Sequence, residues 1–229
     1  MSRRDQVARD LGLGPTWRLR AAPQAETPPL PAPAHDAARA HTIGLMDWPA
    51  LLDEIGNCQA CDLCQARKQA VPGVGDTSAD WLFVGEGPGA EEDERGEPFV
   101  GQAGKLLDAM LAAIDLRRGD NVYIANAVKC RPPNNRTPEA NETAACWPFL
   151  QRQIELIQPK VIVALGRPAA QTLLQAEVRI SAARGRLFDY QGTPVVVTYH
   201  PAYLLRNLAE KAKAWEDLCF MRRAMGDRH

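Results

Sequence analysis

The chain has 229 residues, of which 45% are hydrophobic and 24% charged, so it is long enough for one well-filled core and a tail. Its formal net charge of −1 gives no overall attraction to a polyanion, and no stretch approaches the roughly 20 apolar residues that a membrane span needs. Residues 2–14 contain no signal-peptide core, so we expect a cytoplasmic protein, in which clustered cysteines bind metal more often than they form disulfides.

The N-terminal extension, residues 1–42, differs in composition from the rest of the chain. Residues 21–42 are rich in Ala and Pro, which predicts an extended, disordered linker. Upstream lies Trp17-Arg-Leu-Arg, an aromatic residue flanked by arginines. This segment is either a docking motif for a protein partner or part of a tail without such a role. The globular domain is expected to span residues 43–229.

Four short apolar runs in the remaining sequence predict strands, at residues 80–85, 121–125, 160–165 and 194–199. They do not alternate between apolar and polar residues, which suits strands that are covered on both faces. Helical spacing and cap residues predict the helices between and around them, at 48–55, 102–114, from Thr137-Pro138 to a break or kink at Pro148, then to Ile157, at 166–174 and at 204–225. This alternation predicts an α/β protein, a three-layer α/β/α sandwich with a central four-stranded parallel sheet.

Polar residues directly follow three of the predicted strands: Glu86, Asn126 and His200. Because the carboxyl ends of parallel strands open onto one crevice, where ligands bind in open α/β sheets, we expect these side chains to share a catalytic site. Each has a simpler alternative. Glu86 can cap the next turn, Asn126 can make a turn, and His200 can be held by a backbone bond.

Four of the six cysteines are candidates for a metal site. Cys58-Gln-Ala-Cys61 is a C-x₂-C pair after a predicted helix, and Cys130 and Cys146 frame a polar loop. Four thiolates from two separated loops can hold an iron–sulfur cluster or a tetrahedral zinc ion, and metal binding would order such a loop. The alternative is a set of unrelated buried thiols plus a redox pair. The other two cysteines are expected to be a spare thiol and a helical core residue, Cys64 and Cys219.

The most distinctive motif is a glycine-rich string after the first predicted strand, Gly85-Glu-Gly-Pro-Gly-Ala-Glu-Glu-Asp-Glu-Arg-Gly-Glu-Pro-Phe-Val-Gly-Gln-Ala-Gly-Lys-Leu-Leu-Asp108. It matches neither the Walker nor the dinucleotide-binding pattern. In this string and in three others the chain closely resembles the family 4 uracil-DNA glycosylases: Cys58-Gln-Ala-Cys61-Asp-Leu-Cys-Gln-Ala-Arg67, Asn126-Ala-Val-Lys-Cys-Arg-Pro-Pro133 and Thr198-Tyr-His-Pro-Ala-Tyr-Leu-Leu-Arg206. The resemblance covers about residues 51–215 and implies DNA repair by uracil excision, with a [4Fe–4S] cluster on Cys58, Cys61, Cys130 and Cys146.

The same resemblance implies a role for each matching residue around the base. Phe99 would stack on the extruded uracil ring, Asn126 would read its edge, and Glu92 would reject the methyl group of thymine. His200 would support negative charge on the departing base, and Glu86 would favour the cationic sugar or position the attacking water. These residue types suit a reaction that leaves an oxocarbenium-like sugar and a uracil anion. Without the resemblance, Phe99 could be a core residue and Glu92 part of a solvated acidic loop.

The resemblance also implies contacts with the rest of the DNA. Backbone amides around Gly85 and Gly87 would help to fix the base after it has left the stack. In the segment after His200, a Leu or Tyr would fill the gap that the base leaves, and Arg206 would contact phosphate. Leu204 and Leu205 are the candidate residues for filling this gap.

The function predicted from these motifs is a monofunctional glycosylase that removes uracil from single- and double-stranded DNA and leaves an abasic site. One alternative is a protein that binds or traps uracil-DNA without turnover. Arg184-Gly-Arg186 lacks the histidine nucleophile of a covalent-trapping relative, which disfavours trapping. Another alternative is electron transfer through the cluster, which would leave the uracil-type pocket without a purpose. No sequence feature argues for oligomerisation, so we expect a monomer.

Overall fold

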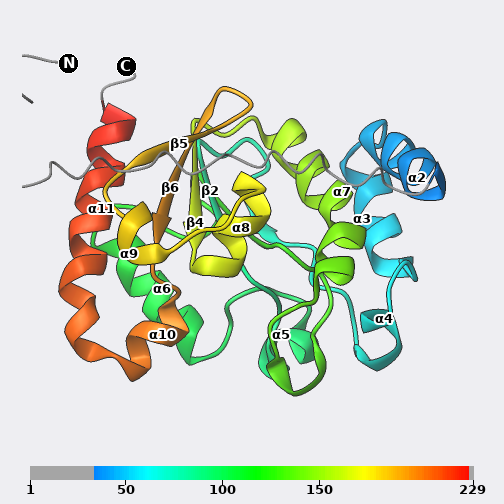
Figure 1. Cartoon of the computed structure of the whole chain (residues 1–229), viewed down its shortest axis with the longest axis horizontal. Coiled ribbons are helices and arrows are strands. Elements are labelled where there is room, and N and C mark those ends of the chain that lie inside the picture. Colours follow the sequence, from blue (N-terminus) through cyan, green and yellow to red (C-terminus); the bar gives the residue numbers. More distant parts are fainter. Residues whose placement is uncertain (1–33, 227–229) are drawn as a thin grey trace, which may run out of the picture. The chain divides into compact units, whose positions relative to one another are not determined.

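A six-stranded sheet forms the centre of the protein, in the order β1-β3-β2-β4-β6-β5 (Figure 1). The structure, a computed structural model, describes residues 34–226. The four inner strands are parallel and match the four predicted runs: β2 (Trp81–Gly85), β3 (Val122–Asn126), β4 (Val161–Leu165) and β6 (Thr193–Thr198). The predicted α/β architecture with a parallel central sheet is therefore confirmed.

The predicted count of four strands is wrong, because two antiparallel strands lie at the edges of the sheet. At one edge β1 (Val74–Gly75) pairs with β3, and at the other β5 (Leu187–Tyr190) pairs with β6. Gln191 and Gly192 join β5 to β6 with positive φ angles of 50° and 88°, the backbone signs of a type I′ hairpin turn. β1 is only two residues long and β5 is largely exposed, so neither produces a buried apolar run.

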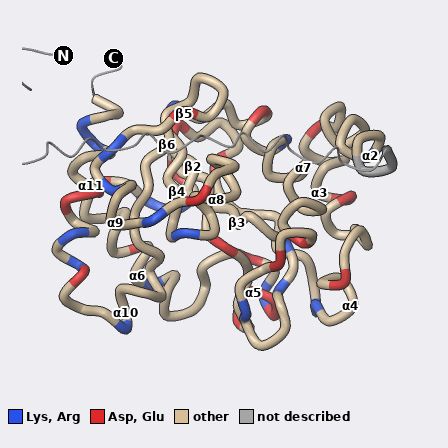
Figure 2. The backbone as a smooth tube through the Cα atoms, viewed as in Figure 1, with Lys and Arg blue, Asp and Glu red and all other residues tan. Residues whose placement is uncertain are grey.

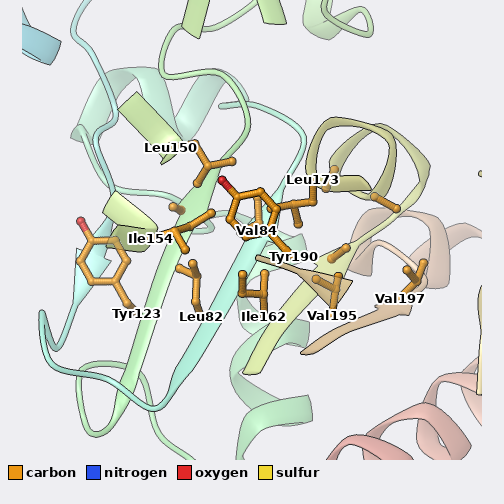
Figure 3. Close-up of a cluster of buried hydrophobic side chains, with 14 of the residues drawn as sticks. Leu82, Val84, Tyr123, Leu150, Ile154, Ile162, Leu173, Tyr190, Val195 and Val197 are labelled. Atoms are coloured by element: carbon orange, nitrogen blue, oxygen red, sulfur yellow. The ribbon is translucent and has the colours of Figure 1, made fainter. Parts of the chain in front are cut away.

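Helices cover both faces of the sheet (Figure 1). One face packs against α7 (Ala140–Ile157) and α8 (Arg167–Leu174), and the other against α6 (Gln102–Ala112), α10 (Pro201–Arg206) and α11 (Lys211–Gly226). Alternate residues of each inner strand belong to opposite clusters, as Leu82 and Phe83 do in β2. Figure 3 shows the α7 and α8 side, where Leu82, Ile162 and Val195 lie next to one another in neighbouring strands. The three predicted layers are thus present.

The remaining helices are short or lie beside the sandwich: α2 (Ala34–Gly44), α3 (Trp48–Asn57), α4 (Leu63–Ala66), α5 (Ala90–Arg95) and α9 (Ile180–Ala183), with 3₁₀ turns η1 (Pro133–Asn135) and η2 (Leu208–Glu210). Asp47 caps α3, because its carboxylate accepts a hydrogen bond from the backbone N–H of Ala50 at 3.0 Å. No helix in the part of the chain that the structure describes is long and apolar enough to cross a membrane.

The predicted boundary of the N-terminal extension is wrong for residues 34–42, which form most of α2. This helix packs against α7, where the Arg39 guanidinium donates to the carbonyl oxygen of Ala145 at 2.7 Å. Ile43 is 1% exposed, so burial compensates for an alanine-rich sequence with few other apolar side chains. The predicted docking motif at Trp17 lies outside the described residues.

Three details of the predicted helices also need correction. Thr137 does not open α7, which begins at Ala140 with Glu139 as its cap, since the Glu142 carboxylate accepts from the Glu139 N–H at 2.7 Å. Pro148 does not break α7, because the buried residues on both sides of it hold the helix against the core. The long helix predicted at 204–225 is divided, since α10 ends at Arg206 and α11 begins at Lys211.

Candidate active site

The carboxyl ends of all four parallel strands open into one cavity of about 920 Å³. Its lining includes Glu86 after β2, Asn126 at the end of β3, Gly166 after β4 and His200 after β6. The three side chains that the sequence placed in one site therefore lie in one cavity. Three further predicted residues line it as well, Gly87, Glu92 and Phe99.

Asn126 carries the clearest sign that the cavity receives a polar ligand. The residue is 2% exposed, and its side-chain Oδ1 is buried without a hydrogen-bond partner among the described residues. An unsatisfied buried acceptor costs about 1–3 kcal/mol. A ligand that donates a hydrogen bond to Oδ1 would remove this cost.

Phe99 lines the cavity, whereas Gly85 is not in its lining and lies next to Asn126 and Phe99. The Phe99 ring stacks on the His200 ring, with centroids 5.4 Å apart and an angle of 29° between the planes. Its φ of 55° is unusual for a side chain of this size and indicates local backbone strain. A Cβ atom on Gly85 would clash with both Asn126 Oδ1 and the Phe99 ring, so only glycine allows these groups to converge.

Glu92 is half-buried, and its carboxylate holds the backbone around Phe99 in place. Oε2 accepts from the N–H of Gly89 at 3.1 Å, and Oε1 accepts from the N–H groups of Val100 and Gly101 at 3.0 and 3.2 Å. The alternative of a solvated acidic loop is therefore wrong for Glu92. Rejection of the thymine methyl group by this side chain stays a prediction.

His200 has one ring nitrogen engaged by the protein. Nδ1 accepts a hydrogen bond from the backbone N–H of Ala202 at 3.1 Å, which caps α10. In the neutral imidazole the proton must then be on Nε2, which is free to donate. Burial, assisted by the charge of Arg206 and opposed by Glu92, lowers the pKa of His200 to about 4. His200 is therefore a neutral hydrogen-bond donor near pH 7.

Glu86 lies in the cavity at the end of β2 and is half-buried. Burial raises the pKa of Glu86, while a hydrogen bond with Thr137 and the charge of Arg167 oppose the rise. Thr137 belongs to the loop between Cys130 and Cys146, so this loop borders the cavity as well as joining two predicted metal ligands.

The predicted DNA-contact residues divide into exposed and buried ones. Leu205 is 40% exposed, and Arg206 is exposed at the lining of the cavity. Leu204 is 1% exposed and belongs to the core cluster that includes α6, so its prediction as a wedge is wrong. In a helix two consecutive residues point in different directions, and here the neighbouring exposed side chains are Leu205 and Tyr203, the latter 37% exposed.

The four predicted cysteine ligands line a second, small cavity together with Cys64. Hydrogen-bond donors point at three of the sulfur atoms. Arg39 Nη2 lies 3.4 Å from Cys58 Sγ, Arg67 Nη1 lies 3.0 Å from Cys130 Sγ, and the backbone N–H of Lys129 donates to Cys146 Sγ at 3.2 Å. Such donors favour thiolates over thiols, so the donor set fits a thiolate-bound cluster.

Burial acts against thiolates at this site, since it raises the pKa of Cys130 and raises that of Cys146 to about 12. A bound cation would compensate for this effect. Within the described residues, no group of three or more His, Cys, Asp and Glu side chains is arranged to hold a metal ion. Cys64 shares the small cavity, so its position does not set it apart from the four assigned ligands.

Sequence reasoning missed the residues that support the two sites. Arg39 falls in a segment that was expected to be disordered, and Lys129 was seen only as the neighbour of a cysteine. Arg67 was noted only as the end of the cysteine motif. For the two arginines the available signal was their chemistry, because a cation beside a cysteine cluster is a natural partner for sulfur.

Comparisons with known proteins point to one family. The model of the Uracil DNA glycosylase superfamily matches residues 72–219. The chain is 44% identical to the type-4 uracil-DNA glycosylase of Pyrobaculum aerophilum over 182 residues, which are 76% of this chain and 92% of that protein. It is 49% identical to the type-4 enzyme of Archaeoglobus fulgidus, with 68% of this chain and 81% of the relative covered. It is 48% identical to the type-4 enzyme of Thermotoga maritima, with 70% of this chain and 84% of the relative covered.

Proposed function

The chain belongs to the uracil DNA glycosylase superfamily, and from this premise we propose how its residues recognise uracil and break the bond to the sugar. It is a uracil-DNA glycosylase, a hydrolase that acts on N-glycosyl bonds in DNA repair. The observation that carries the proposed mechanism is the shared cavity of Glu86, Asn126 and His200. We place the catalytic domain from residue 34 onwards, since α2 packs on α7.

Asn126 and Phe99 recognise the base. The unpaired Oδ1 of Asn126 accepts the N3–H of uracil, and the amide NH₂ donates to O4. Phe99 stacks on the ring, and its strained backbone is held by the Glu92 carboxylate. Glu92 and the backbone of Gly87 close the pocket around C5, which leaves less room for a methyl group. Extrusion of the base from the stack costs a few kcal/mol, which these contacts offset.

His200 and Glu86 stabilise the two charges that bond cleavage creates. As the N1–C1′ bond breaks, its electron pair leaves with the base, and His200 Nε2–H donates to O2 of the forming uracil anion. The ionised Glu86 carboxylate stabilises the oxocarbenium-like sugar and orients a water molecule towards C1′. Addition of this water and loss of its proton give the abasic site, while uracil is released after protonation. A fixed neutral donor needs no reorganisation at the moment of reaction.

We assign a [4Fe–4S] cluster to Cys58, Cys61, Cys130 and Cys146. Support comes from their common cavity and from the three donors that point at their sulfur atoms. When bound, the cluster supplies binding energy that orders the loop between the last two ligands. Zinc is the alternative, and a purified protein with broad visible absorption would exclude it. A protein partner for the N-terminal extension stays a prediction. The monomeric state and the cytoplasmic location also stay predictions.

The surface near the cavity carries basic residues that suit a DNA backbone. Figure 2 shows Lys and Arg along α11, interspersed with acidic residues, and Arg206 at the end of α10 lines the cavity. Arg206, Lys211 and Lys213 are exposed. Phosphate contacts of this kind position the duplex and carry no sequence information.

The direct test is incubation of purified protein with single- and double-stranded oligonucleotides that contain one uracil. We expect alkali to cleave the uracil strand afterwards and to leave a thymine-containing strand intact. A protein–DNA species that survives denaturation, without released uracil, would instead support the trapping alternative. Intact uracil strands with a fully metal-loaded protein would contradict the proposed function.

A further inference from the structure

Lys129 is a cationic side chain in the core, and none of the roles described so far uses it. Its exposed fraction is 1%, although lysine is rarely buried without partners. It lies three residues after Asn126 and beside Cys130, between the strand end that faces uracil and the cysteine site. Removing an ammonium group from water costs several kcal/mol, so its contacts must recover that energy.

The Lys129 ammonium group ties the end of β3 to α7. Nζ donates to the backbone carbonyl oxygen of Asn126 at 2.8 Å and to Gln153 Oε1 at 2.7 Å. Gln153 is itself fully buried, and its amide donates to the carbonyl oxygen of Pro72 at 2.8 Å. The Asn126 carbonyl is therefore held by the Lys129 side chain, which is itself anchored on Gln153 of α7.

The main chain of Lys129 connects the same point to the cysteine site. Its N–H donates to Cys146 Sγ at 3.2 Å, and the next residue is the ligand Cys130. One residue thus contacts the carbonyl of the uracil-reading Asn126 with its side chain and the sulfur of a metal ligand with its backbone.

The Asn126 side chain depends on how its own backbone is held, because no hydrogen bond within the described residues holds its side-chain oxygen. Oδ1 has no hydrogen-bond partner, so the direction of the amide is set by the backbone and by packing against Phe99 and Gly85. The backbone after Asn126 is fixed on the β2 side by hydrogen bonds from Ala127 to Gly85 and from Val128 to Glu86. Lys129 supplies the bond to the carbonyl of Asn126 itself.

We propose that Lys129 is a positioning residue for uracil recognition, which fixes the Asn126 amide and links it to the cysteine site. This inference rests on the proposed function of Asn126 as the reader of the uracil edge. It gives the cysteine site a second effect besides stability, because displacement of Cys146 moves the residue that orients the base-reading amide.

The test compares Lys129→Met with Lys105→Met, a matched change at an exposed lysine of α6. We expect Lys129→Met to raise both the KM for uracil-DNA and the calorimetric Kd of free uracil by about tenfold, because small displacements of a positioned group have effects of this size or more. The kcat should change less than KM, and binding to abasic DNA should stay at the Lys105→Met level. The thermal midpoint shows whether each variant is folded, and visible absorption shows whether it carries the cluster.

The Asn126→Ala background separates positioning from general loosening. If Lys129 acts through the Asn126 amide, Lys129→Met raises the Kd of uracil when Asn126 is present. In the Asn126→Ala background the same change has little further effect on this Kd. An equal effect in both backgrounds, or an unchanged Kd in folded Lys129→Met, would overturn the proposal. Lys129→Gln, which keeps one donor, gives the same comparison if the Met variant does not fold. A wild-type protein that neither binds nor releases uracil would refute the proposed function instead.

Discussion

Glu86 and His200, two titratable residues of the cavity, have pKa values shifted in opposite directions by the same cause. Burial disfavours the charged form of each group, which raises the pKa of the Glu86 carboxyl and lowers that of the His200 imidazole to about 4. The working forms in the proposed mechanism are the Glu86 carboxylate and the neutral His200. Both exist together only above the raised pKa of Glu86.

The pH dependence of kcat/KM follows from these shifts. As pH falls through the raised pKa of Glu86, the carboxylate is protonated and activity falls, whereas His200 gains its proton only near pH 4. Glu86→Gln should lower kcat by about 10²–10³, the usual effect of losing one electrostatic stabiliser, and should remove this acidic limb. Measurements of kcat/KM from pH 4 to 9 for both proteins test this prediction. Glu97→Gln, at an exposed site of the same acidic segment, is the control, and near-normal cleavage by Glu86→Gln would exclude the proposed role.

A site residue could be predicted from the sequence when its position in the chain fixes its position in space. Glu86, Asn126 and His200 each follow a buried apolar run, and parallel topology brings such positions together. The alternative of a backbone bond to His200 is also present, since the N–H of Ala202 donates to Nδ1, but the sequence did not indicate which ring nitrogen it engages. The support of Phe99 by Glu92 was equally hidden, because the acidic string looks solvated.

At the scale of secondary structure, α10 separates one leucine for the core from one for the surface. Leu204 packs in the cluster with α6 and α11, and Leu205 is 40% exposed. Sequence alone offered both leucines as wedge residues, since two adjacent apolar residues in a short helix do not reveal which one faces inward. The edge strands escaped prediction for a similar reason, because their burial is incomplete.

Single alanine changes at these two leucines should therefore have different effects. Leu204→Ala should lower the free energy of unfolding by about 2–5 kcal/mol, as large-to-small core changes do. Leu205→Ala should change it by less than about 0.5 kcal/mol yet reduce excision from duplex DNA more than from single strands. Denaturant unfolding and paired rate measurements test both. Equal losses on the two DNA forms would rule out Leu205 as the group that fills the gap.

At the scale of the whole molecule, α2 joins the sandwich to the cysteine site. Arg39 contacts the carbonyl of Ala145 and the sulfur of Cys58, and Ile43 is buried beside Cys130 and Cys146 in the third core cluster. The global topology was predictable because it follows from the order of buried strands and helices. The part played by α2 was not, since its alanine-rich sequence resembles a linker and gains stability only from packing.

Removal of α2 should weaken both the fold and the cysteine site. A chain that begins at Met46 should melt roughly 5–10 °C below one that begins at Ala34, since burial of Ile43 alone contributes about 1.5–3 kcal/mol and each kcal/mol shifts Tm by about 2–4 °C at this size. It should also lose visible absorption faster under a chelator. Calorimetry and absorption spectra of the two proteins measure this. Equal midpoints would show that α2 contributes nothing to stability.

The order of the strands along the chain has a consequence during synthesis. The amide and the ring that we propose to bind uracil, those of Asn126 and Phe99, are encoded before residue 130, while His200 arrives with the last strand and the beginning of α10. In the proposed mechanism, a nascent polypeptide on the ribosome therefore already contains the residues that bind the base while the donor to the leaving group is still missing. Translation must pass beyond β6 before the first DNA lesion can be repaired.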